Sequence, residues 1–563
     1  MRWKINPLPD QKIVTALQET LKIDAILATL LAQRGITDFA EAEKFFRPSS
    51  HHLHDPYLMK DMQKAVARIS TALEKGERIL VYGDYDVDGT TSVALMASYL
   101  GNFTTNLSTY IPDRYQEGYG VSYEGIDFAD NNDFSLIIAL DCGIKAVDKV
   151  AYALEKGIDF IICDHHTPGE QVPDAYAILN PKQKDCSYPY KELCGCGVGF
   201  KLIQALHLHK KHVFEDLIPY LDLVAVAIGA DIVPMTGENR VLMHLGLSVL
   251  NTKPRPGFQQ ILAQLKKKTF DVYDVVFVIA PRINAAGRMK HGSYAVQLLM
   301  ENDTEQAKQQ CAAIETYNKD RKETDANITE EALLQIEKNG ETQHKTTVVY
   351  QENWHKGVIG IVASRLTEHY YRPTVVFTKS GEKLAASARS VSGFDLYEAL
   401  ECCAEHIEQF GGHKYAAGLT LLPEKYQAFK DTFEKVVTES ILPELLEPSL
   451  KIDLEITLGD ISEKFYRILQ QMAPFGPGNM SPVFVARQVR DTGYAKAIGK
   501  ENDHLRLTLT QNGSAPIASV GFGFGHLAEQ IKHRAFDVVF SLDKNVWNGQ
   551  ESLQLKIKDI RVV

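Results

Sequence analysis

The chain has 563 residues, of which 45% are hydrophobic and 24% are charged, and this length exceeds what one hydrophobic core can organise. We therefore expect about three or four domains of ordinary size. A net charge of -11 argues against a protein that coats nucleic acid over its whole surface, and the absence of a secretory signal and of a ~20-residue apolar run predicts a cytoplasmic protein without membrane contact.

The first elements in chain order are helices, over residues 11–47 and 62–76, where apolar residues recur at helical spacing. The stretch 78–89 follows, with a short apolar strand and then Asp84, Asp86 and Asp88 before a helix from residue 90. Alternate residues of an extended segment project the same way, so these carboxylates would converge and repel one another. A hard divalent cation between them resolves the repulsion. An Asp-rich turn that caps the next helix is the alternative.

Three further apolar strands are predicted over residues 134–140, 160–163 and 177–179, and they alternate with helical stretches. This alternation is typical of an α/β fold with a doubly wound parallel sheet, whose sites form beyond the carboxyl ends of the strands. The residues expected at such ends are Asp84, Asp86, Asp141, Asp164, His165 and His166. Their common position is the strongest indication of a metal site.

The segments that connect these strands leave several interpretations open. Arg114, in the glycine- and aromatic-containing loop 111–120, could meet an anion or be solvated, and this loop is expected to be a mobile surface loop. Cys186, Cys194 and Cys196 lack a fourth ligand with zinc-type spacing, and glycines that open a helix explain residues 193–200 better. Asp231 follows an apolar helix over 220–230 and is either a lone cap or the last carboxylate of the cluster.

Residues 281–288 place Arg282 and Arg288 on either side of small residues. Two guanidinium groups suit a phosphate, since each can bind two of its oxygens, and a glycine-bearing loop with surface arginines is the alternative. A polar helix over 304–338 then predicts a solvated connector between two lobes, with the substrate in the cleft between them.

The second lobe begins with a strand over 346–350 and a helix preceded by His355, and it ends near residue 445. Gly411 and Gly412 predict a glycine turn beside His413, which could contact phosphate or be structural. From residue 449 the pattern changes to five or so short antiparallel strands, with a hairpin turn at Asn548-Gly549. This pattern favours a small barrel that binds single strands, although a purely structural barrel fits as well.

Taken together, these residues resemble the DHH phosphoesterase superfamily, which is named for the triplet present here as Asp164-His165-His166. The resemblance to its RecJ branch of bacterial single-strand-specific exonucleases covers essentially the whole chain, up to the stretch Pro474-Phe475-Gly476-Pro477-Gly478-Asn479. It implies an N-terminal helical section (1–75), a DHH domain (76–235), a helical extension with an Arg-rich loop (236–303), a connector helix (304–340), a DHHA1 domain (341–445) and an OB-type β-barrel (449–563).

The resemblance also implies a chemistry and its residues. Two divalent ions, Mn²⁺ or Mg²⁺, would activate water for in-line attack on phosphorus. The expected metal ligands are Asp84, Asp86, Asp88, Asp141, His165 and Asp231, the last assigned by the resemblance. The expected catalytic residues are His166, Asp164 and Arg282. We expect the substrate to be held by Arg114, Arg288, His355, Ser387, Arg389 and His413, with Arg114 at a 5′ phosphate.

The implied activity is 5′-to-3′ hydrolysis of single-stranded DNA to mononucleotides, in DNA repair and recombination, by a monomer that works with a helicase and a single-strand-binding protein. One alternative is a DHH/DHHA1 phosphodiesterase that acts on pyrophosphate, short oligonucleotides or cyclic dinucleotides, and such enzymes are usually shorter and lack the barrel. The other is a non-catalytic replication scaffold, which the full set of expected ligands argues against.

Overall fold

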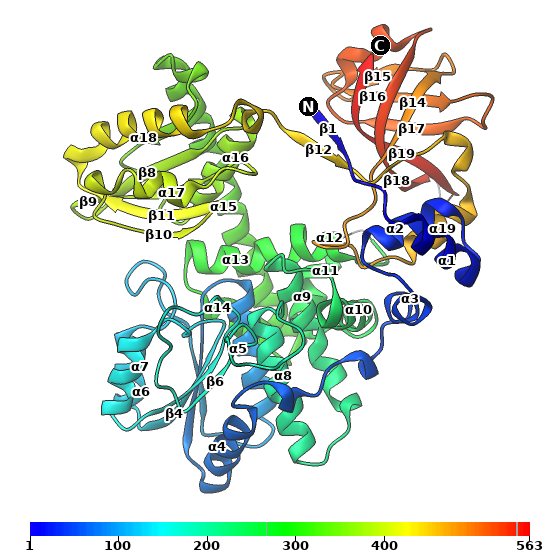
Figure 1. Cartoon of the computed structure of the whole chain (residues 1–563). Helices are drawn as coiled ribbons and strands as arrows, with labels where there is room; N and C mark the ends of the chain where they lie inside the picture. Colours follow the sequence, from blue (N-terminus) through cyan, green and yellow to red (C-terminus); the bar gives the residue numbers. More distant parts are fainter. Residues whose placement is uncertain (266, 548–549, 563) are drawn as a thin grey trace. The chain divides into compact units, whose positions relative to one another are not determined.

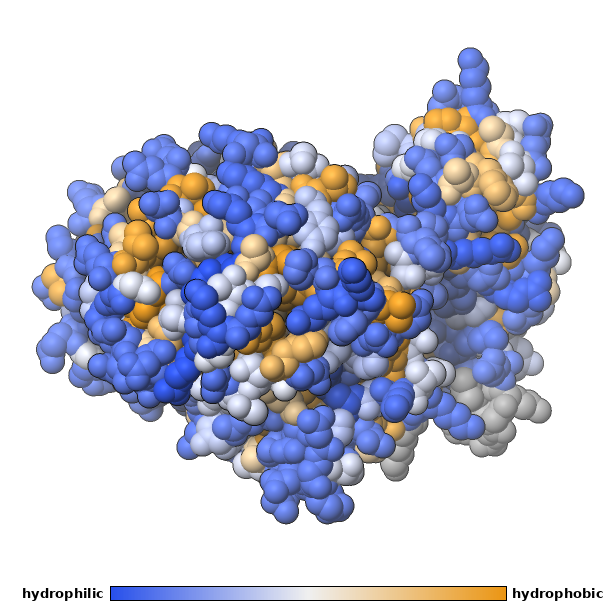
Figure 2. All heavy atoms as spheres, turned by 90° about the horizontal axis from the view of Figure 1, so that it is seen from below, coloured by the Kyte–Doolittle hydropathy of each residue, from blue (hydrophilic) through white to orange (hydrophobic). Residues whose placement is uncertain are grey.

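The computed structural model describes residues 1–265, 267–547 and 550–562, which form two compact units. The two-sheet unit comprises Pro56–Asp231 and Gly246–Pro448, and the barrel unit comprises Met1–Asp55, Ile232–Leu245 and Ser449–Val563. Among the described residues, none of the helices has the length and apolar character needed to span a membrane. On the face seen in Figure 2, hydrophilic residues predominate and hydrophobic ones gather in small patches.

The first sheet of the two-sheet unit is parallel throughout, as the sequence predicts (Figure 1). Its strand order is β3-β2-β4-β5-β6, and β3 was not among the predicted strands. Its apolar strands are buried because helices cover both faces. The strands are β2 (Arg78–Gly83), β3 (Leu107–Tyr110), β4 (Phe134–Leu140), β5 (Asp159–Cys163) and β6 (Ala177–Leu179). The helices are α4 (Met62–Lys75), α5 (Val87–Leu100), α6 (Tyr123–Asn131), α7 (Val147–Glu155), α8 (Gly195–His209) and α9 (Leu221–Ala230).

A helical segment leads from this sheet to the connector helix. It consists of α10 (Gly237–Thr252), α11 (Pro256–Ala263), α12 (Val272–Asp274), the π-helical η4 (Val275–Ile279), α13 (Ala280–Met289), α14 (Ser293–Met300) and α15 (Thr304–Lys338). The expected Arg-rich loop is therefore wrong, because Arg282 and Arg288 both lie in α13. Pro281 lies in the first turn of α13, directly after η4. The connector helix has the bounds that the sequence predicts.

The second sheet has the order β10-β11-β9-β8-β7, and only β7 and β8 run parallel. Gly411, Gly412 and His413 lie in a strand, so the predicted glycine turn is wrong, and the chain reverses after His413 instead. The strands are β7 (Thr347–Tyr350), β8 (Thr374–Ser380), β9 (Lys383–Arg389), β10 (Gln409–His413) and β11 (Ala416–Leu421), and the helices are α16 (Ile359–Tyr370), α17 (Leu396–Glu401) and α18 (Tyr426–Ser440).

In the barrel unit, β14, β18, β19, β17 and β16 close into a ring, because β14 pairs with both β18 and β16. The expectation of short antiparallel strands is corrected in two respects: β18 and β19 have 13 residues each, and β17 runs parallel to β19. The predicted turn at Asn548-Gly549 lies outside the described residues. The elements are β12 (Ser449–Ile452), β13 (Leu454–Glu455), α19 (Glu463–Gln470), β14 (Phe484–Asp491), β15 (Lys496–Ile498), β16 (His504–Thr510), β17 (Ile517–Gly521), α20 (Ala528–Ile531), β18 (Ala535–Trp547) and β19 (Gln550–Val562).

The start of the chain packs against this barrel. Residues of α1 (Gln11–Leu21), α2 (Ala25–Gln33) and α3 (Phe39–Phe46) share one hydrophobic core with the barrel strands, and β1 (Arg2–Ile5) pairs in parallel with β12. The section predicted as 1–75 is thus divided, since α4 packs with the first sheet of the other unit.

Candidate metal centre

The aspartate turn after β2 differs from the extended segment that the sequence suggested. Helix α5 begins at Val87, so Asp86 is its N-cap, with a side chain that accepts a hydrogen bond from the Gly89 N–H at 3.0 Å, and Asp88 lies in its first turn. Asp84 is fully buried, and its Oδ2 has no hydrogen-bond partner among the described residues. Asp84 therefore follows the end of β2, and Asp86 and Asp88 lie at the start of α5. Of the three, only Asp86 caps the helix, which was the alternative interpretation of this stretch.

Asp88 joins α5 to the start of α8. Its two carboxylate oxygens accept the backbone N–H groups of Gly195 at 2.6 Å and Cys196 at 2.7 Å. An anion is favoured there because the first N–H groups of a helix lack intrahelical partners. A Cβ at Gly195 would lie 2.5 Å from the Asp141 Cβ and 2.8 Å from its Cα, so only glycine allows this approach. The Cys194 side chain caps α8, and the site contains no cysteine cluster of the zinc type among the described residues.

The next two strands deliver the remaining candidates of the sheet. Asp141 follows β4 and has φ +59°, a left-handed conformation that is uncommon for aspartate and that the surrounding structure must hold in place. Asp164, His165 and His166 follow β5, which pairs with β4 in parallel. Parallel pairing brings these strand ends to one edge of the sheet, as the sequence predicts.

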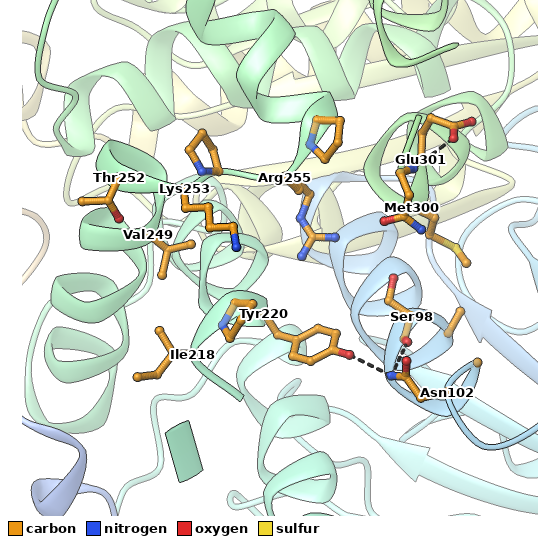
Figure 3. Close-up of a pocket in the computed structure, with 16 residues that line it drawn as sticks. Ser98, Asn102, Ile218, Tyr220, Val249, Thr252, Lys253, Arg255, Met300 and Glu301 are labelled. Atoms are coloured by element: carbon orange, nitrogen blue, oxygen red, sulfur yellow. Dashed lines mark hydrogen bonds between the residues drawn. The ribbon is translucent and has the colours of Figure 1, made fainter. Parts of the chain in front are cut away.

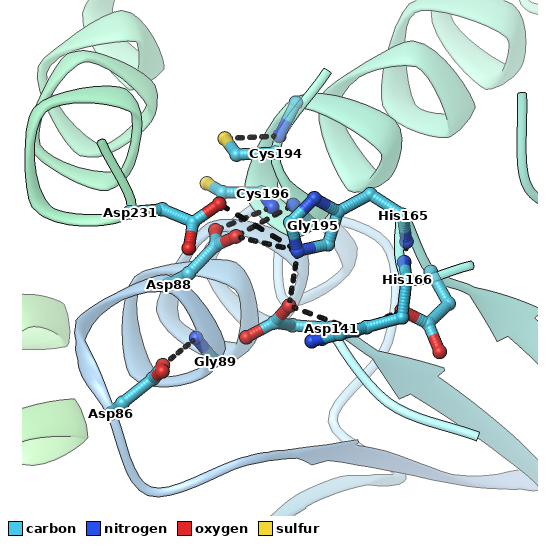
Figure 4. A network of polar contacts seen from close by, with 12 residues as sticks. Asp86, Asp88, Gly89, Asp141, His165, His166, Cys194, Gly195, Cys196 and Asp231 are labelled. Carbon is cyan, nitrogen blue, oxygen red and sulfur yellow. Dashed lines mark hydrogen bonds and ion pairs between the residues drawn. The ribbon is translucent and has the colours of Figure 1, made fainter. Parts of the chain in front are cut away.

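His165 is at the centre of the cluster (Figure 4). Its Nε2 lies 3.2 Å from Asp141 Oδ1, 3.6 Å from Asp231 Oδ2 and 3.8 Å from Asp88 Oδ2. Possible ligand atoms of Asp88, His165 and Asp231 all lie within 4.8 Å of one another, and so do those of Asp141, His165 and His166. Asp231, directly after α9, therefore joins the cluster in space. Asp84 and Asp86 belong to neither group.

The electrostatics of this cluster fit a bound cation. Burial, reinforced by neighbouring carboxylates, raises the pKa of Asp84 to about 8, of Asp88 to about 7 and of Asp231 to about 9. Asp141 and Asp231 each retain a buried oxygen without a hydrogen-bond partner in the described residues. Burial lowers the pKa of His165 to about 3, which keeps the imidazole neutral and able to bind a metal. Such donors need a divalent cation as counter-charge, and mixed carboxylate and imidazole ligands suit manganese.

Asp164 contacts its neighbour His166 and belongs to neither of the two groups of possible metal ligands. Its Oδ1 accepts hydrogen bonds from the His165 N–H at 2.7 Å and from the His166 N–H at 3.1 Å, and it lies 2.7 Å from His166 Nδ1. Although burial alone would raise it, these contacts lower the pKa of Asp164 to about 2. The carboxylate thus fixes the His166 ring and raises the pKa of that imidazole. The other ring nitrogen, Nε2, lies 3.1 Å from the Tyr119 hydroxyl.

A cluster of arginines lies next to the aspartate turn. The Arg114 guanidinium stacks 4.0 Å over the ring of Tyr85, which stands between Asp84 and Asp86 in the chain. The loop that carries Arg114 is only partly exposed, and its Tyr115 hydroxyl donates to the Arg288 carbonyl.

Arg288 Nη1 donates to the Gly357 carbonyl at 2.9 Å, and Arg389 donates to the Ser387 hydroxyl at 3.0 Å. Arg389 also borders the start of α16, since a Cβ at Gly360 would lie 3.2 Å from its Nη2. Burial and the charges of Arg114 and Arg389 lower the pKa of Arg288. A cluster of like charges of this kind is suited to an anion such as phosphate.

Other predicted residues lie elsewhere. Arg282 forms an ion pair with Glu315 of α15 and donates to the Val278 carbonyl at 2.9 Å, and its described contacts include no metal-cluster residue. His413 is exposed at the end of β10. His355 packs edge-on against Tyr115, with ring centroids 6.2 Å apart, and so borders the arginine cluster. The catalytic role of Arg282 and the substrate role of His413 remain predictions.

Three residues of the site were missed by the sequence reasoning: Gly195, Tyr115 and Tyr119. The sequence shows glycines that open a helix, but nothing in it indicates that Gly195 faces Asp141. The two tyrosines lie in a segment singled out only for Arg114. A signal was available, because binding and catalytic residues are frequently found on loops that a rigid scaffold positions.

A cavity of about 650 Å³ lies in the same unit, between the carboxyl-terminal ends of α5, α10 and α14 (Figure 3). Its principal polar side chains are satisfied by the protein: the Asn102 amide donates to the Tyr220 hydroxyl at 2.9 Å, and Arg255 forms an ion pair with Asp222 at 2.8 Å. It lies at the opposite end of α5 from Asp86 and Asp88.

Comparisons with known proteins agree with this architecture. Residues 78–228 match the DHH family, N-terminal domain, residues 343–439 match the DHHA1 domain, and residues 452–559 match the RecJ OB domain. The single-stranded-DNA-specific exonuclease RecJ of Bacillus subtilis is 38% identical over 571 residues, covering 100% of this chain and 71% of that protein. The enzyme of the same description from Salmonella typhimurium is 34% identical over 575 residues, covering 96% and 97%.

Solved structures give the same result. The crystal structure of RecJ in complex with Mn²⁺ from Thermus thermophilus covers 100% of this chain and 79% of its own, with a TM-score of 0.86 at 27% identity. A crystal structure of exonuclease RecJ bound to manganese covers 69% and 96%, with a TM-score of 0.61 at 31% identity. In sequence, in domain order and in fold, the chain therefore belongs to the RecJ family of DHH proteins.

Proposed function

We propose that this protein is a metal-dependent exonuclease that hydrolyses single-stranded DNA from the 5′ end and releases 5′-mononucleotides. The observation that carries the proposal is the position of the arginine cluster beside the carboxylate cluster, with Arg114 stacked on Tyr85 between two of the aspartates. A terminal phosphate held there would place a phosphodiester close to the metal centre. An anchored end next to the reactive group favours an exonuclease over an endonuclease.

The proposed metal-holding residues are Asp84, Asp86, Asp88, Asp141, His165 and Asp231, and two ions of Mn²⁺ or Mg²⁺ suit that number of carboxylates. When bound, such ions supply an activated water and neutralise charge on phosphorus. The chain itself contributes the arrangement: Gly195 and Cys196 hold Asp88 through their N–H groups.

His166 is the proposed proton donor or hydrogen-bond donor to the scissile phosphate. Asp164 holds its Nδ1 side, which leaves Nε2 for the Tyr119 hydroxyl or for a phosphate oxygen. The raised pKa of His166 favours the protonated ring, which is the form that stabilises developing negative charge. His166 therefore complements the arginines, which bind charge already present on the substrate.

The barrel supports a single-stranded substrate. Phe522, with 54% of its surface exposed, packs edge-on against His504 at 5.0 Å between ring centroids, and Lys556 Nζ lies 5.9 Å from its ring. An exposed aromatic side chain beside basic groups is the usual means by which OB folds stack unpaired bases. The alternative function, hydrolysis of short oligonucleotides or cyclic dinucleotides, uses the same metal cluster. It does not require the barrel surface around Phe522, His504 and Lys556.

The test is product analysis with Mn²⁺ on a 5′-phosphorylated single strand, a blunt duplex and a cyclic dinucleotide. We expect mononucleotides to appear progressively from the 5′ end of the single strand alone. Asp141→Ala should lower the rate by at least about a hundredfold, because even outer-shell changes at metal sites cost 10–100-fold, whereas Asp148→Ala, at an exposed position of α7, should not change it. Cleavage of the cyclic dinucleotide alone would replace the proposal by the alternative, and nuclease activity in Asp141→Ala would refute the metal assignment.

A further inference from the structure

The connector helix α15 carries a buried stripe that is apolar at both ends and polar in its middle. Seven of its buried positions recur at spacings of three, four or seven residues: Cys311, Ile314, Asn318, Asp325, Ile328, Ala332 and Ile336. Arg321 completes the spacing between Asn318 and Asp325. Helical spacing of this kind marks the face that packs against the rest of the unit. A connector that only spanned two domains would need no buried carboxylate on that face.

Asp325 is fully buried, and the described partners of its carboxylate are guanidinium groups. Its counter-charges come from two helices. Arg365 Nη2 of α16 lies 2.7 Å from Oδ2, and Arg321 Nη1, one turn earlier on α15, lies 3.8 Å from it. Because an uncompensated buried carboxylate is strongly unfavourable, these two guanidinium groups are held close to it.

The arginines around Asp325 belong to the same cluster that borders the metal centre. Arg288 of α13 donates to the Gly357 carbonyl just before α16, and its neighbour Met289 packs in one hydrophobic cluster with Ile328 of α15, so α13, α15 and α16 meet here. The charge of Arg321 also contributes to the lowered pKa of Arg288, in agreement with this packing. Arg114 and Arg321 each bury an Nε group that has no hydrogen-bond partner in the described residues. The cluster thus combines unpaired donors with a surplus of positive charge, and Asp325 is the carboxylate at its inner side.

We propose that Asp325 is a positioning residue for the terminal phosphate, which holds Arg321 and Arg365 so that Arg321, Arg288 and Arg114 form one site drawn from three segments of the chain. The proposal deepens the proposed function and rests on it. Arg321 becomes a further phosphate-binding residue, and the connector helix becomes part of the substrate site.

The physical reason lies in the repulsion between the guanidinium groups. Without a fixed anion, neighbouring guanidinium groups separate, and an incoming phosphate must then reassemble them at the expense of its own binding energy. The Asp325 carboxylate offsets part of the repulsion between the guanidinium groups before substrate binds. The Nε groups of Arg114 and Arg321, which have no hydrogen-bond partner in the described residues, remain available to the phosphate. The contribution is therefore specific to a strand that carries a terminal phosphate.

The experiment compares two single strands of identical sequence, one with a 5′ phosphate and one with a 5′ hydroxyl, in steady-state hydrolysis with Mn²⁺. For the wild type we expect a lower KM for the phosphorylated strand. The ratio of interest is the KM for the 5′-hydroxyl strand divided by the KM for the 5′-phosphorylated strand. Asp325→Asn should reduce this ratio by about tenfold, the equivalent of one charge-assisted hydrogen bond. The kcat on the 5′-hydroxyl strand should stay unchanged. Asp320→Asn, at an exposed position of the same helix, is the matched control and should keep the wild-type ratio.

A purely structural role would lower the melting temperature and leave the KM ratio unchanged, and that result would overturn the proposal. Arg321→Gln provides a second test that does not depend on the folding of Asp325→Asn, and an unchanged ratio there would overturn it as well. In the Arg321→Gln background, Asp325→Asn should add less than about threefold, since residues that act through one another are not additive.

Failure of the underlying function would look different. An active wild-type enzyme with equal KM values for both strands refutes the phosphate site and Asp325's role while the nuclease activity stands. A wild-type enzyme that hydrolyses neither strand refutes the proposed function itself, and the role of Asp325 with it.

Discussion

Replacement of Gly195 by alanine tests whether the start of α8 sets the geometry of the metal centre. The added Cβ would lie 2.5 Å from the Asp141 Cβ, 2.7 Å from its Oδ1 and 2.8 Å from its Cα. Carbon atoms pack at about 3.5 Å, so one of the two segments must move by roughly 1 Å. Because one of the contacted atoms is backbone, a side-chain rotation cannot relieve the overlap.

This displacement would move two metal-cluster residues at once, since the Gly195 N–H also donates to Asp88 at 2.6 Å. A 1 Å misplacement in an active site costs about a hundredfold in rate, and we expect Gly195→Ala to lose that much in Mn²⁺-dependent hydrolysis of single-stranded DNA. Overpacking of a close-packed site should also lower the free energy of unfolding by about 1–3 kcal/mol. Titration calorimetry should show weaker Mn²⁺ binding by the folded variant.

Gly197→Ala is the matched control, because it lies two residues further along the same helix and its Cβ would find only the Leu193 side chain, at 3.4 Å, and more distant atoms. Alanine also has a higher helix propensity than glycine, so this variant should be as active and at least as stable as the wild type. Full activity in Gly195→Ala, or an equal loss in Gly197→Ala, would refute the assignment of Gly195 to the metal centre.

Two further outcomes follow from the site. Tyr119→Phe removes the hydroxyl 3.1 Å from His166 Nε2 and should lower kcat by about fivefold, the worth of one hydrogen bond, with Mn²⁺ affinity unchanged; lost Mn²⁺ binding would contradict this role. The pKa values of Asp88 and Asp231, raised to about 7 and about 9, predict that thermal stability of the metal-free protein falls as pH rises from about 4 towards 9, because the folded state binds more protons than the unfolded chain. Added Mn²⁺ should restore the melting temperature at pH 8 to 9, and metal binding should release protons in calorimetry in that range; a melting temperature independent of pH and metal would contradict the site.

Much of the fold could be predicted because its signals are local. A run such as Phe134 to Leu140 is apolar throughout, and only a strand covered on both faces buries such a run. The connector helix could be bounded at both ends, since Asp303 caps its start and Asn339-Gly340 follow its end. The positions of Asp141 and Asp164 were predictable for the same reason, because each directly follows an apolar strand.

The arginines show where local signals end. Arg282 and Arg288 are six residues apart in α13, and at about 100° per residue they point to different sides of the helix. One side carries Arg282 to Glu315, and the other carries Arg288 to Gly357 and the arginine cluster. The sequence by itself gives both residues the same surroundings of small side chains, so it could not separate them.

The sequence by itself therefore determined the strands β2, β4, β5 and β6, the connector helix and the carboxylates at the sheet edge, which depend on neighbours along the chain. Only the tertiary structure decided that Asp88 is held by Gly195, 107 positions away. It also decided that Asp325, in a helix expected to be solvated, is buried between arginines of α15 and α16. Such contacts arise when separate elements pack against one another. Their cost or benefit depends on charge, distance and burial, none of which exists before the chain has folded.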